Sequence, residues 1–250
     1  MKESAMTTKD KVIVALEKEK GAFVSGEALA KNCNVSRNAI WKSIGELKEL
    51  GYSIQSVPNR GYMLEESSDI ISKAGICMCL GNAKKKIFDR IHVYDELDST
   101  NKEAKRSLFF PDSKFLHGTV IVAKRQTAGR GHAGSRFASP EGGIYLSILF
   151  DAEKMKDSAA PIAQLVSSAV SQVLGRLCAL TVTEGKDSSL YVGQDKVCGI
   201  LTEGLVDLET GVFSNYIVGI GIWLKKLQSL QCRCPRKNEV IAALIQALDL

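Results

Sequence analysis

The chain has 250 residues, of which 45% are hydrophobic and 24% are charged, and its formal net charge is +5. This length accommodates about two domains, since domains usually run ~100 to 200 residues, and the mild positive charge permits an acidic partner without indicating nucleic acid by itself. No apolar run reaches the about 18 residues that a transmembrane helix needs, and the polar first residues do not resemble a secretory signal, so we expect a cytoplasmic protein without membrane contact.

Residues 1–66 carry the pattern of a winged helix-turn-helix domain. Apolar side chains at helical spacing predict a first helix over residues 8–20. Ser25 can cap a second helix, and Ser36 can cap a third helix after a tight turn over residues 32–35. Two helices joined by a tight turn and followed by a short hairpin are typical of this class of DNA-binding domain.

The third helix is predicted to be the one that enters the major groove of DNA. Its apolar face is expected to comprise Ile40, Trp41, Ile44 and Leu47, which leaves the polar side chains of its N-terminal half exposed. The turn at residues 58–61 joins two short strands into a wing with a basic tip. The residues expected to contact DNA are Ser36, Arg37, Asn38, Lys42, Ser43 and Arg60.

The charge of this domain leaves two interpretations open. Residues 31–64 hold five Lys or Arg against two Glu, which is a modest surplus, so a small helical domain that binds protein is the alternative to DNA binding. Because one such domain holds DNA weakly, we expect a homodimer that binds two half-sites of an operator.

Residues 67–86 are expected to form a linker, because they begin with serine and acidic residues and end in three lysines. Residues 87–250 read as a second, α+β domain, in which a mixed sheet carries helices. The expected strands are residues 87–97, 118–123, 144–150 and 216–222, and residues 190–203 are expected to form a hairpin of two further strands. The expected helices are residues 99–108, 161–177 and 238–248.

Seven cysteines are scattered through the chain, and an odd number in a protein expected inside the cell argues against a disulfide framework. Cys77 and Cys79 are separated by one residue, as are Cys232 and Cys234. This spacing is tighter than the two- to four-residue gap of zinc sites, and no histidine lies near either pair. No metal site is therefore expected.

Several motifs follow one another along residues 10–248. They are SGEALA, SRNAIWKSIGELKELGYSI, VPNRGYML, LDSTNKEAK, HGTVIVAKRQTAGRG, SPEGGIYLSILF, VGQDKVCGILTE and IVGIGI. Together they resemble the family of bifunctional biotin-protein ligases and biotin operon repressors. The resemblance implies that biotin and ATP with Mg²⁺ give biotinyl-adenylate, and that the biotin passes to a lysine of the biotin carboxyl carrier domain of acetyl-CoA carboxylase. It also implies that the adenylate-bound form dimerises and represses biotin genes.

The resemblance also identifies candidate biotin-binding residues. Short polar side chains at the start of a helix can bind the ureido ring of biotin, and glycines let the backbone approach a ligand closely. The matching residues are Ser99, Thr100, Asn101, Gln126, Gly129, Arg130, Gly131, Gly199, Ile200, Leu201, Gly219 and Gly221. Taken alone, each glycine is equally consistent with a tight turn.

The chain departs from the family pattern where the reaction needs positive charge. The family loop GRGRxGR reads GRGHAGS here, so His132 and Ser135 replace two arginines. Gly185 stands where the family has the lysine that neutralises charge between the biotin carboxylate and the α-phosphate. The candidate catalytic substitutes are Lys186 and His132. An imidazole lacks the guanidinium fork, however, and a slip of one residue along a strand turns Lys186 to the opposite face.

Two further departures concern the nucleotide. Trp223 replaces the small amide that ends the family motif GIGIN. The small C-terminal β domain of the family is expected to be absent, because the chain stops near the end of the catalytic domain. Removing one preorganised charge-stabilising group costs about 100- to 1000-fold in rate, so impaired ligase chemistry is expected.

Three functions remain in competition. The favoured one is a biotin-responsive transcriptional repressor that binds operator DNA and either biotin or biotinyl-adenylate, with ligase chemistry impaired. The alternative is a working ATP-dependent ligase that biotinylates a carrier-domain lysine. The third is a paralogue that has lost both activities.

Overall fold

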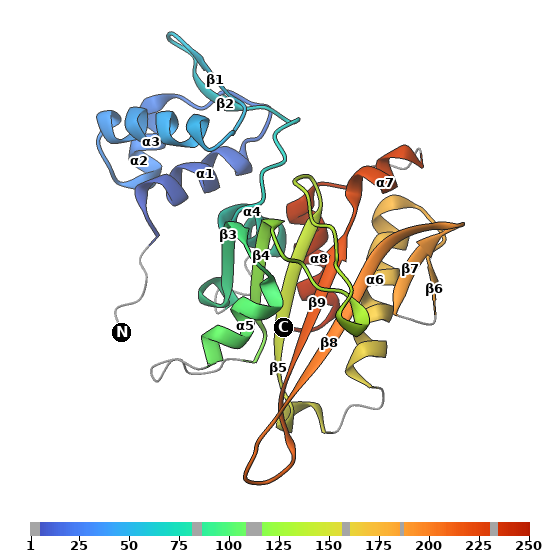
Figure 1. Cartoon of the computed structure of the whole chain (residues 1–250). Helices are drawn as coiled ribbons and strands as arrows, with labels where there is room; N and C mark the ends of the chain where they lie inside the picture. Colours follow the sequence, from blue (N-terminus) through green and yellow to red (C-terminus); the bar gives the residue numbers. More distant parts are fainter. Residues whose placement is uncertain (1–5, 82–86, 109–116, 157–160, 186–187, 231–234) are drawn as a thin grey trace. The chain divides into compact units, whose positions relative to one another are not determined.

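The computed structural model describes residues 6–81, 87–108, 117–156, 161–185, 188–230 and 235–250. The chain divides into two compact units, residues 1–83 and residues 84–250 (Figure 1). The pair Cys232 and Cys234, and the candidate catalytic Lys186, lie outside the described residues.

The first unit is a winged helix-turn-helix, as the sequence predicts. Its elements are α1 (Thr8–Lys18), α2 (Gly26–Cys33), α3 (Arg37–Glu49), β1 (Ile54–Val57), β2 (Gly61–Leu64) and α4 (Lys73–Leu80). The Ser25 hydroxyl accepts a hydrogen bond from the Ala28 N–H, and the Ser36 hydroxyl accepts one from the Ala39 N–H, which confirms both predicted caps. Each cap satisfies a backbone donor that its helix leaves unpaired.

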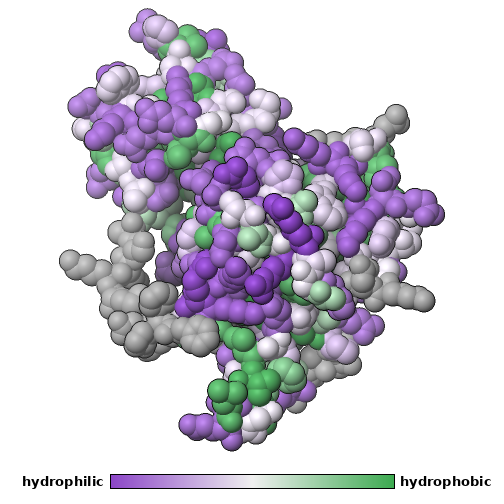
Figure 2. Space-filling view, in the orientation of Figure 1, coloured by the Kyte–Doolittle hydropathy of each residue, from purple (hydrophilic) through white to green (hydrophobic). Residues whose placement is uncertain are grey.

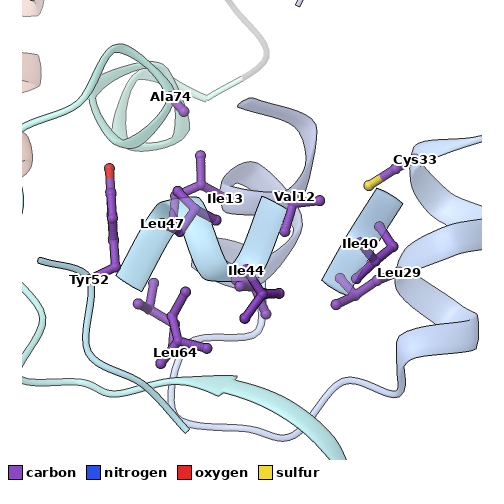
Figure 3. Packing of buried hydrophobic residues seen from close by; sticks show 12 residues of the cluster. Val12, Ile13, Leu29, Cys33, Ile40, Ile44, Leu47, Tyr52, Leu64 and Ala74 are labelled. Atoms are coloured by element: carbon purple, nitrogen blue, oxygen red, sulfur yellow. The ribbon is translucent and has the colours of Figure 1, made fainter. Parts of the chain in front are cut away.

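Buried apolar side chains of the three helices and the hairpin form the core of this unit. Figure 3 shows Ile40, Ile44 and Leu47 of α3 directed into this core, which also receives Val12 and Ile13 of α1. The segment expected as a linker contributes α4, and its Ala74 joins the same core. Part of residues 67–86 is therefore a packed helix.

Two side chains of α3 lie on the opposite side from the one predicted. Trp41, expected in the core, is 66% exposed, whereas Ser43, expected to face DNA, is only 6% exposed. The helix is rotated about its axis relative to the expected apolar face, since Ile40, Ile44 and Leu47 at spacings of four and three residues define a stripe that excludes residue 41. The exposed face of α3 therefore carries the Trp41 indole, and the Ser43 hydroxyl is not part of it.

The wing is a two-stranded antiparallel hairpin whose turn depends on two backbone positions with positive φ. Asn59 and Gly61 have φ of 61° and 101°. A Cβ atom at Gly61 would lie 2.1 Å from the Val24 carbonyl oxygen. Tyr62 and Val24 exchange two backbone hydrogen bonds, so the wing is fastened to the segment before α2 and only glycine fits at residue 61.

The second unit is a seven-stranded mixed sheet with strand order β3-β4-β5-β9-β8-β7-β6. Strands β3 and β4 are parallel, and the other neighbours are antiparallel. The strands are β3 (Ile91–Leu97), β4 (Thr119–Gln126), β5 (Ile144–Asp151), β6 (Thr183–Glu184), β7 (Ser189–Val192), β8 (Asp195–Val206) and β9 (Phe213–Ile222). The helices are α5 (Thr100–Leu108), α6 (Ile162–Cys178), α7 (Leu224–Ser229) and α8 (Lys237–Ala247).

Helices cover the two faces of this sheet unequally. In Figure 1, α5 lies on one face and α6 and α8 lie on the other. Strand β5 is buried along nearly its whole length, which is why its sequence IYLSILF is a continuous apolar run instead of an alternating one. Ala104 of α5 packs on Ile121, Leu149 and Ile217, so α5 is held on its face by a small core of its own.

The turn between β8 and β9 carries large exposed apolar side chains, which appear as a green patch in Figure 2. Leu208 is 97% exposed, and Val212 and Phe213 are about half exposed. None of the helices in the described part of the chain combines the length and the apolar character that crossing a membrane requires.

Candidate functional site

The predicted biotin residues come together around one cavity of about 260 Å³ in the second unit. It lies on the α5 face of the sheet, between the start of α5, the loop that follows β4, and strands β7, β8 and β9. The predicted residues that line it are Ser99, Thr100, Asn101, Gln126, Arg130, Gly131, His132, Gly199, Ile200, Leu201, Gly219 and Gly221. Gly129 is buried in the adjoining loop.

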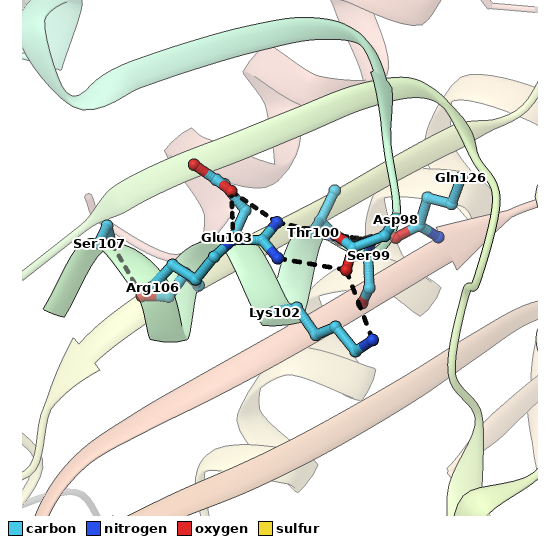
Figure 4. Close-up of polar contacts among 9 residues, drawn as sticks. Asp98, Ser99, Thr100, Lys102, Glu103, Arg106, Ser107 and Gln126 are labelled. Carbon is cyan, nitrogen blue, oxygen red and sulfur yellow. Dashed lines mark hydrogen bonds and ion pairs between the residues drawn. The ribbon is translucent and has the colours of Figure 1, made fainter. Parts of the chain in front are cut away.

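Asp98 fixes the start of α5 at the cavity (Figure 4). Its carboxylate accepts a hydrogen bond of 2.8 Å from the Ser99 N–H and ion pairs with Arg106 at 2.8 Å. The Arg106 guanidinium, together with the Ser99 N–H, holds the pKa of Asp98 well below its usual range. A carboxylate at this position is favoured because the first backbone N–H groups of a helix are unpaired and partly positive.

Gln126 connects this helix to the loop that follows β4. Its side-chain oxygen accepts hydrogen bonds from the Thr100 N–H at 2.8 Å and from the Thr100 hydroxyl at 3.1 Å, and its side-chain NH₂ donates to the Ser139 hydroxyl at 2.8 Å. All polar atoms of the Gln126 side chain thus have protein partners. Gln126 therefore ties the start of α5 to the loop after β4, and it also lines the cavity.

Asn101 is held in a second network on the same helix. Its side-chain NH₂ donates to Glu203 at 2.7 Å, and Lys105 forms an ion pair with the same carboxylate at 2.6 Å. The Ser147 hydroxyl lies 2.6 Å from the Asn101 side-chain oxygen. Burial raises the pKa of Glu203, but the hydrogen bonds from Lys105 and Asn101 and the nearby positive charges lower it by more, so its net pKa lies below the ordinary value.

The glycines of β8 and β9 make room for other side chains of the protein. Gly199 and Gly221 are directly paired across the two strands, and a Cβ atom on them would lie 2.7 Å and 2.2 Å from the ring of Phe137. A Cβ atom on Gly219 would lie 2.4 Å from the Asn101 side-chain oxygen. These glycines therefore seat an aromatic ring and an amide that themselves form the cavity.

Phe137 and Trp223 line the cavity as a stacked pair. Their ring centroids are 4.4 Å apart with an interplanar angle of 13°. The Trp223 indole N–H donates to the Ala138 carbonyl at 2.8 Å, and its backbone N–H donates to the Val197 carbonyl at 3.0 Å. The indole at this position thus links the loop to the end of β9, and its stacking on Phe137 is a contact that a small amide cannot make.

The cavity wall is positively charged. The cations that line it are Arg130, Arg136 and Lys196, with His132 beside them, and none of the described lining residues is a carboxylate. The loop folds back on itself: the backbones of Arg130 and Arg136 form an isolated antiparallel β-bridge, and the Gly131 N–H donates to the Ser135 carbonyl. Such a wall favours a ligand with a negative charge.

Sequence reasoning missed Phe137, Arg136, Ser189 and Lys196 as lining residues. Arg136 follows the predicted loop motif by one residue, so a wider window on the loop would have included it. Lys196 lies within the quoted motif VGQDKVCGILTE, but regular strand alternation would turn its side chain to the opposite face of the sheet from Gly199. Gly185, in contrast, contributes no side chain, and its N–H donates to the Ser189 carbonyl at 2.8 Å.

On the first unit, the residues predicted to contact DNA lie on α3 and the wing. Arg37, Asn38 and Lys42 are exposed. Together with Trp41 and the wing turn, Arg37 and Asn38 line a hollow of about 800 Å³. Arg60 lies over the ring of Phe23 at 4.2 Å, which holds its guanidinium beside the wing. Ser36 is engaged as the cap of α3, and Ser43 is buried.

Comparison with known proteins gives one matching family model for each of the two units. A family model described as an HTH domain matches residues 8–63, and one described as the biotin/lipoate A/B protein ligase family matches residues 94–222. The chain is 30% identical over 203 residues to the bifunctional ligase/repressor BirA of Escherichia coli, which covers 81% of this chain and 60% of that protein. It is 28% identical over 218 residues to the bifunctional ligase/repressor BirA of Bacillus spizizenii, covering 86% of this chain and 65% of that protein.

Among solved structures, the biotin protein ligase from Aquifex aeolicus in complex with biotin and ATP superposes with a TM-score of 0.51 at 24% identity, covering 64% of this chain and 68% of that one. This likeness shows a common fold. The chain spans about 60 to 65% of the length of the curated relatives that it matches. The match over residues 94–222, more than half of the chain, establishes that this protein belongs to the biotin/lipoate A/B protein ligase family and carries a helix-turn-helix domain before the ligase-like unit.

Proposed function

We propose that this protein is a biotin-responsive transcriptional repressor, which binds operator DNA as a homodimer and binds biotin or biotinyl-adenylate in the cavity of its second unit. The recognition surface of α3 and the wing supports DNA binding, and the names of the BirA relatives join a ligase and a repressor in one protein. Two half-sites on DNA require two copies of the N-terminal unit.

The composition of the cavity wall is the observation that carries this proposal. The start of α5 contributes short polar side chains to the cavity wall, and Arg130, Arg136 and Lys196 contribute positive charge, without a carboxylate among the described lining residues. Biotin has a polar ureido ring at one end and a carboxylate at the other. A ligand of that kind matches the lining of the cavity in hydrogen bonding and in charge.

Impaired ligation is part of the proposal. Gly185 has no side chain where the family resemblance expects a lysine, and His132 and Ser135 stand where it expects arginines. The stacked pair of Phe137 and Trp223 lines the cavity, with Trp223 where the family resemblance expects a small amide. Loss of one preorganised cation costs about 100- to 1000-fold in rate, so the missing groups slow adenylation far more than they weaken binding.

A working biotin ligase is the second candidate, and the cations Arg130, Arg136 and Lys196 favour it. ATP with Mg²⁺ would supply the activated phosphate, and the substrate would be a lysine of a biotin carboxyl carrier domain. In that case these cations would hold the negative charge of the ligand and the leaving phosphate. The two candidates differ only in how fast biotin reaches the carrier.

Two measurements on the full chain test the proposed repressor. Titration calorimetry with biotin is expected to give a saturable binding heat. Selection of duplexes from a random library, with and without biotin, is expected to enrich a site with two half-sites more strongly when biotin is present. The absence of both a binding heat and an enriched sequence would contradict the proposal. An Arg37→Ala, Asn38→Ala double variant, which should retain the binding heat but lose the enrichment, is the control.

A further inference from the structure

Ser147 is a small polar residue in the middle of the apolar strand β5. It is fully buried, between the apolar residues Leu146 and Ile148. Its directly paired residue on β9 is Gly219, and a Cβ atom there would lie 2.4 Å from the Asn101 side-chain oxygen. The Asn101 amide therefore occupies the space over Gly219, beside Ser147. Because a buried hydroxyl is costly unless it is hydrogen-bonded, its partners indicate what Ser147 does.

The Ser147 hydroxyl joins two residues at the start of α5. Its oxygen lies 2.7 Å from the Thr100 hydroxyl and 2.6 Å from the Asn101 side-chain oxygen. Thr100 and Asn101 both line the cavity, whereas Ser147 is not among its described lining residues. An effect of Ser147 on a bound ligand therefore passes through these two side chains.

Glu203 determines the direction of these hydrogen bonds. Its carboxylate, ion-paired with Lys105, can only accept, so the Asn101 side-chain NH₂ is the group that faces it, at 2.7 Å. The Asn101 side-chain oxygen then faces Ser147, and this oxygen can only accept as well. The single proton of the Ser147 hydroxyl is therefore donated to Asn101, at 2.6 Å.

The same direction continues to Thr100. Two hydroxyl oxygens 2.7 Å apart share one proton, and since Ser147 donates its own to Asn101, the Thr100 hydroxyl is the donor in this pair. Gln126 is the other neighbour of this hydroxyl (Figure 4), and its oxygen, at 3.1 Å, is also an acceptor because it receives the Thr100 backbone N–H. The hydroxyl proton of Thr100 thus stays with protein atoms, and only its lone pairs face the cavity.

These groups form a chain of hydrogen bonds that all point the same way, from Thr100 through Ser147 and Asn101 to the Glu203 carboxylate. Aligned hydrogen bonds polarise one another inside a protein, and the negative charge at one end makes the reverse direction unfavourable. Thr100 and Asn101 are each only 4% exposed, so little water competes for these bonds. A ligand that meets the Thr100 hydroxyl therefore finds an acceptor and needs an N–H or O–H donor of its own.

We propose that Ser147 is a positioning residue that, together with Glu203, holds the Thr100 hydroxyl as an acceptor and thereby makes the cavity select a ligand with an N–H donor. This assignment rests on the proposed function, because the ligand that tests it is biotin, whose ureido ring carries two N–H groups. Ser147 acts on the ligand only through Thr100 and Asn101. A loss of packing at Ser147 alone would weaken all ligands alike and would not change which one is preferred.

Calorimetry on the full chain with matched ligands tests this role. The ligands are biotin and the two cyclic carbamates in which an oxygen atom replaces one or the other ureido N–H, so that a donor becomes an acceptor without added bulk. Ser147→Ala removes the hydroxyl. Glu203→Gln replaces the carboxylate with an amide that can also donate, which lets the Asn101 amide turn. Ser167→Ala, at another fully buried serine of the second unit, is the matched control. Thermal unfolding of each variant verifies that it is folded.

Wild-type protein is expected to bind biotin about 10- to 100-fold more tightly than one of the carbamates, because in that complex the Thr100 acceptor lies opposite a second acceptor. Ser147→Ala and Glu203→Gln should each weaken biotin binding. Each should also reduce the preference for biotin by at least about fivefold, since the Thr100 hydroxyl can then turn and donate to the carbamate oxygen. Ser167→Ala should leave the preference unchanged.

A Ser147→Ala variant that keeps the wild-type preference, whether or not it binds both kinds of ligand more weakly, would assign Ser147 a structural role and overturn the inference. If Ser147→Ala does not fold, the same criterion applies to Glu203→Gln. A wild-type protein that binds biotin and both carbamates equally would overturn this assignment and leave the proposed function intact. A wild-type protein that gives no binding heat with biotin would overturn the proposed function and this assignment together.

Discussion

The indole of Trp223 lies flat on the ring of Phe137, with 4.4 Å between centroids, and Phe137 in turn lies over the paired glycines Gly199 and Gly221. This stack joins the loop after β4 to Trp223, the first residue after β9. The cavity wall thus combines an aromatic pair, which packs, with the positive charges of Arg130, Arg136 and Lys196, which attract anions.

Trp223→Ala is expected to loosen the loop. The substitution removes the stack with Phe137 and the hydrogen bond to the Ala138 carbonyl, which together are worth about 1 to 3 kcal/mol. Chemical denaturation should show a loss of stability of that size, and calorimetry should show weaker biotin binding. Trp223→Phe keeps the stack but lacks the indole N–H, so its stability should lie between those of the wild type and Trp223→Ala. Equal stability of all three proteins would show that Trp223 does not hold the loop.

Gly221→Ala is expected to displace Phe137. Its Cβ atom would lie 2.2 Å from the ring, so the ring has to move, at a cost of about 1 to 3 kcal/mol for overpacking. Biotin binding should weaken, and the fluorescence of the neighbouring Trp223 should change. Gly45→Ala is the control, because its Cβ atom would meet nothing within 4 Å and helical alanine is favoured over glycine. If Gly221→Ala kept the fluorescence and the biotin affinity of the wild type, the claim that Gly221 makes room for the Phe137 ring would be contradicted.

Glu203→Gln is expected to disrupt the Asn101 network. The variant loses the ion pair with Lys105, and we expect a destabilisation of about 1 to 2 kcal/mol at pH 7, since the pair is partly buried. Urea unfolding of wild type and variant, compared at several pH values, measures this difference. Because Asn101 lines the cavity, the loss of its hydrogen bond to Glu203 should also weaken biotin binding.

The pH dependence of that difference has a definite sign. The folded-state pKa of Glu203 lies below its ordinary value, so its contribution is fully present above the unfolded pKa of about 4.3 and is lost as the pH falls through the lower folded value. The stability gap between wild type and Glu203→Gln should therefore shrink on acidification below about pH 4. A gap that stays constant from pH 7 to pH 3 would show that the carboxylate charge plays no part.

Trp41→Ala is expected to separate DNA binding from folding. The indole is 66% exposed beside Arg37 and Asn38, so its removal should change the free energy of unfolding by less than about 0.5 kcal/mol. Binding to the selected operator should weaken about tenfold or more, in a fluorescence anisotropy titration at fixed salt. Leu208→Ala, at a similarly exposed apolar residue of the second unit, should leave DNA binding unchanged. An unaltered operator affinity in Trp41→Ala would remove Trp41 from the DNA surface.

The elements that local chemistry determines were predictable from the sequence. Ser25 and Ser36 cap their helices as expected, and the β7–β8 hairpin turns at Gly193 because short polar and glycine residues favour a turn there. The candidate cavity residues could be chosen from the family resemblance because each sits in a motif. Their assembly around one cavity agrees with that choice.

The remaining features depend on tertiary packing. Helical periodicity did not determine whether Trp41 or Ser43 faces the core, because the stripe through Ile40, Ile44 and Leu47 is narrow. A β-bulge at Val197, in the pairing of β7 with β8, has no sequence signature, so alternation along β8 gives the wrong face for Lys196. The glycines of β8 and β9 line the cavity as the family resemblance predicts, but the sequence does not show that they also make room for the ring of Phe137 and the amide of Asn101.

Transfer of biotin to a purified carrier domain, in the presence of ATP and Mg²⁺, tests most directly whether this protein binds biotin without efficient ligation. Wild-type protein is compared with a Gly185→Lys, His132→Arg double variant that restores two cations of the family pattern. We expect wild type to be slower by at least about 100-fold, the effect of losing one charge-stabilising group. Wild-type incorporation as fast as that of the double variant would contradict the proposed loss of ligation and would identify the protein as a working ligase.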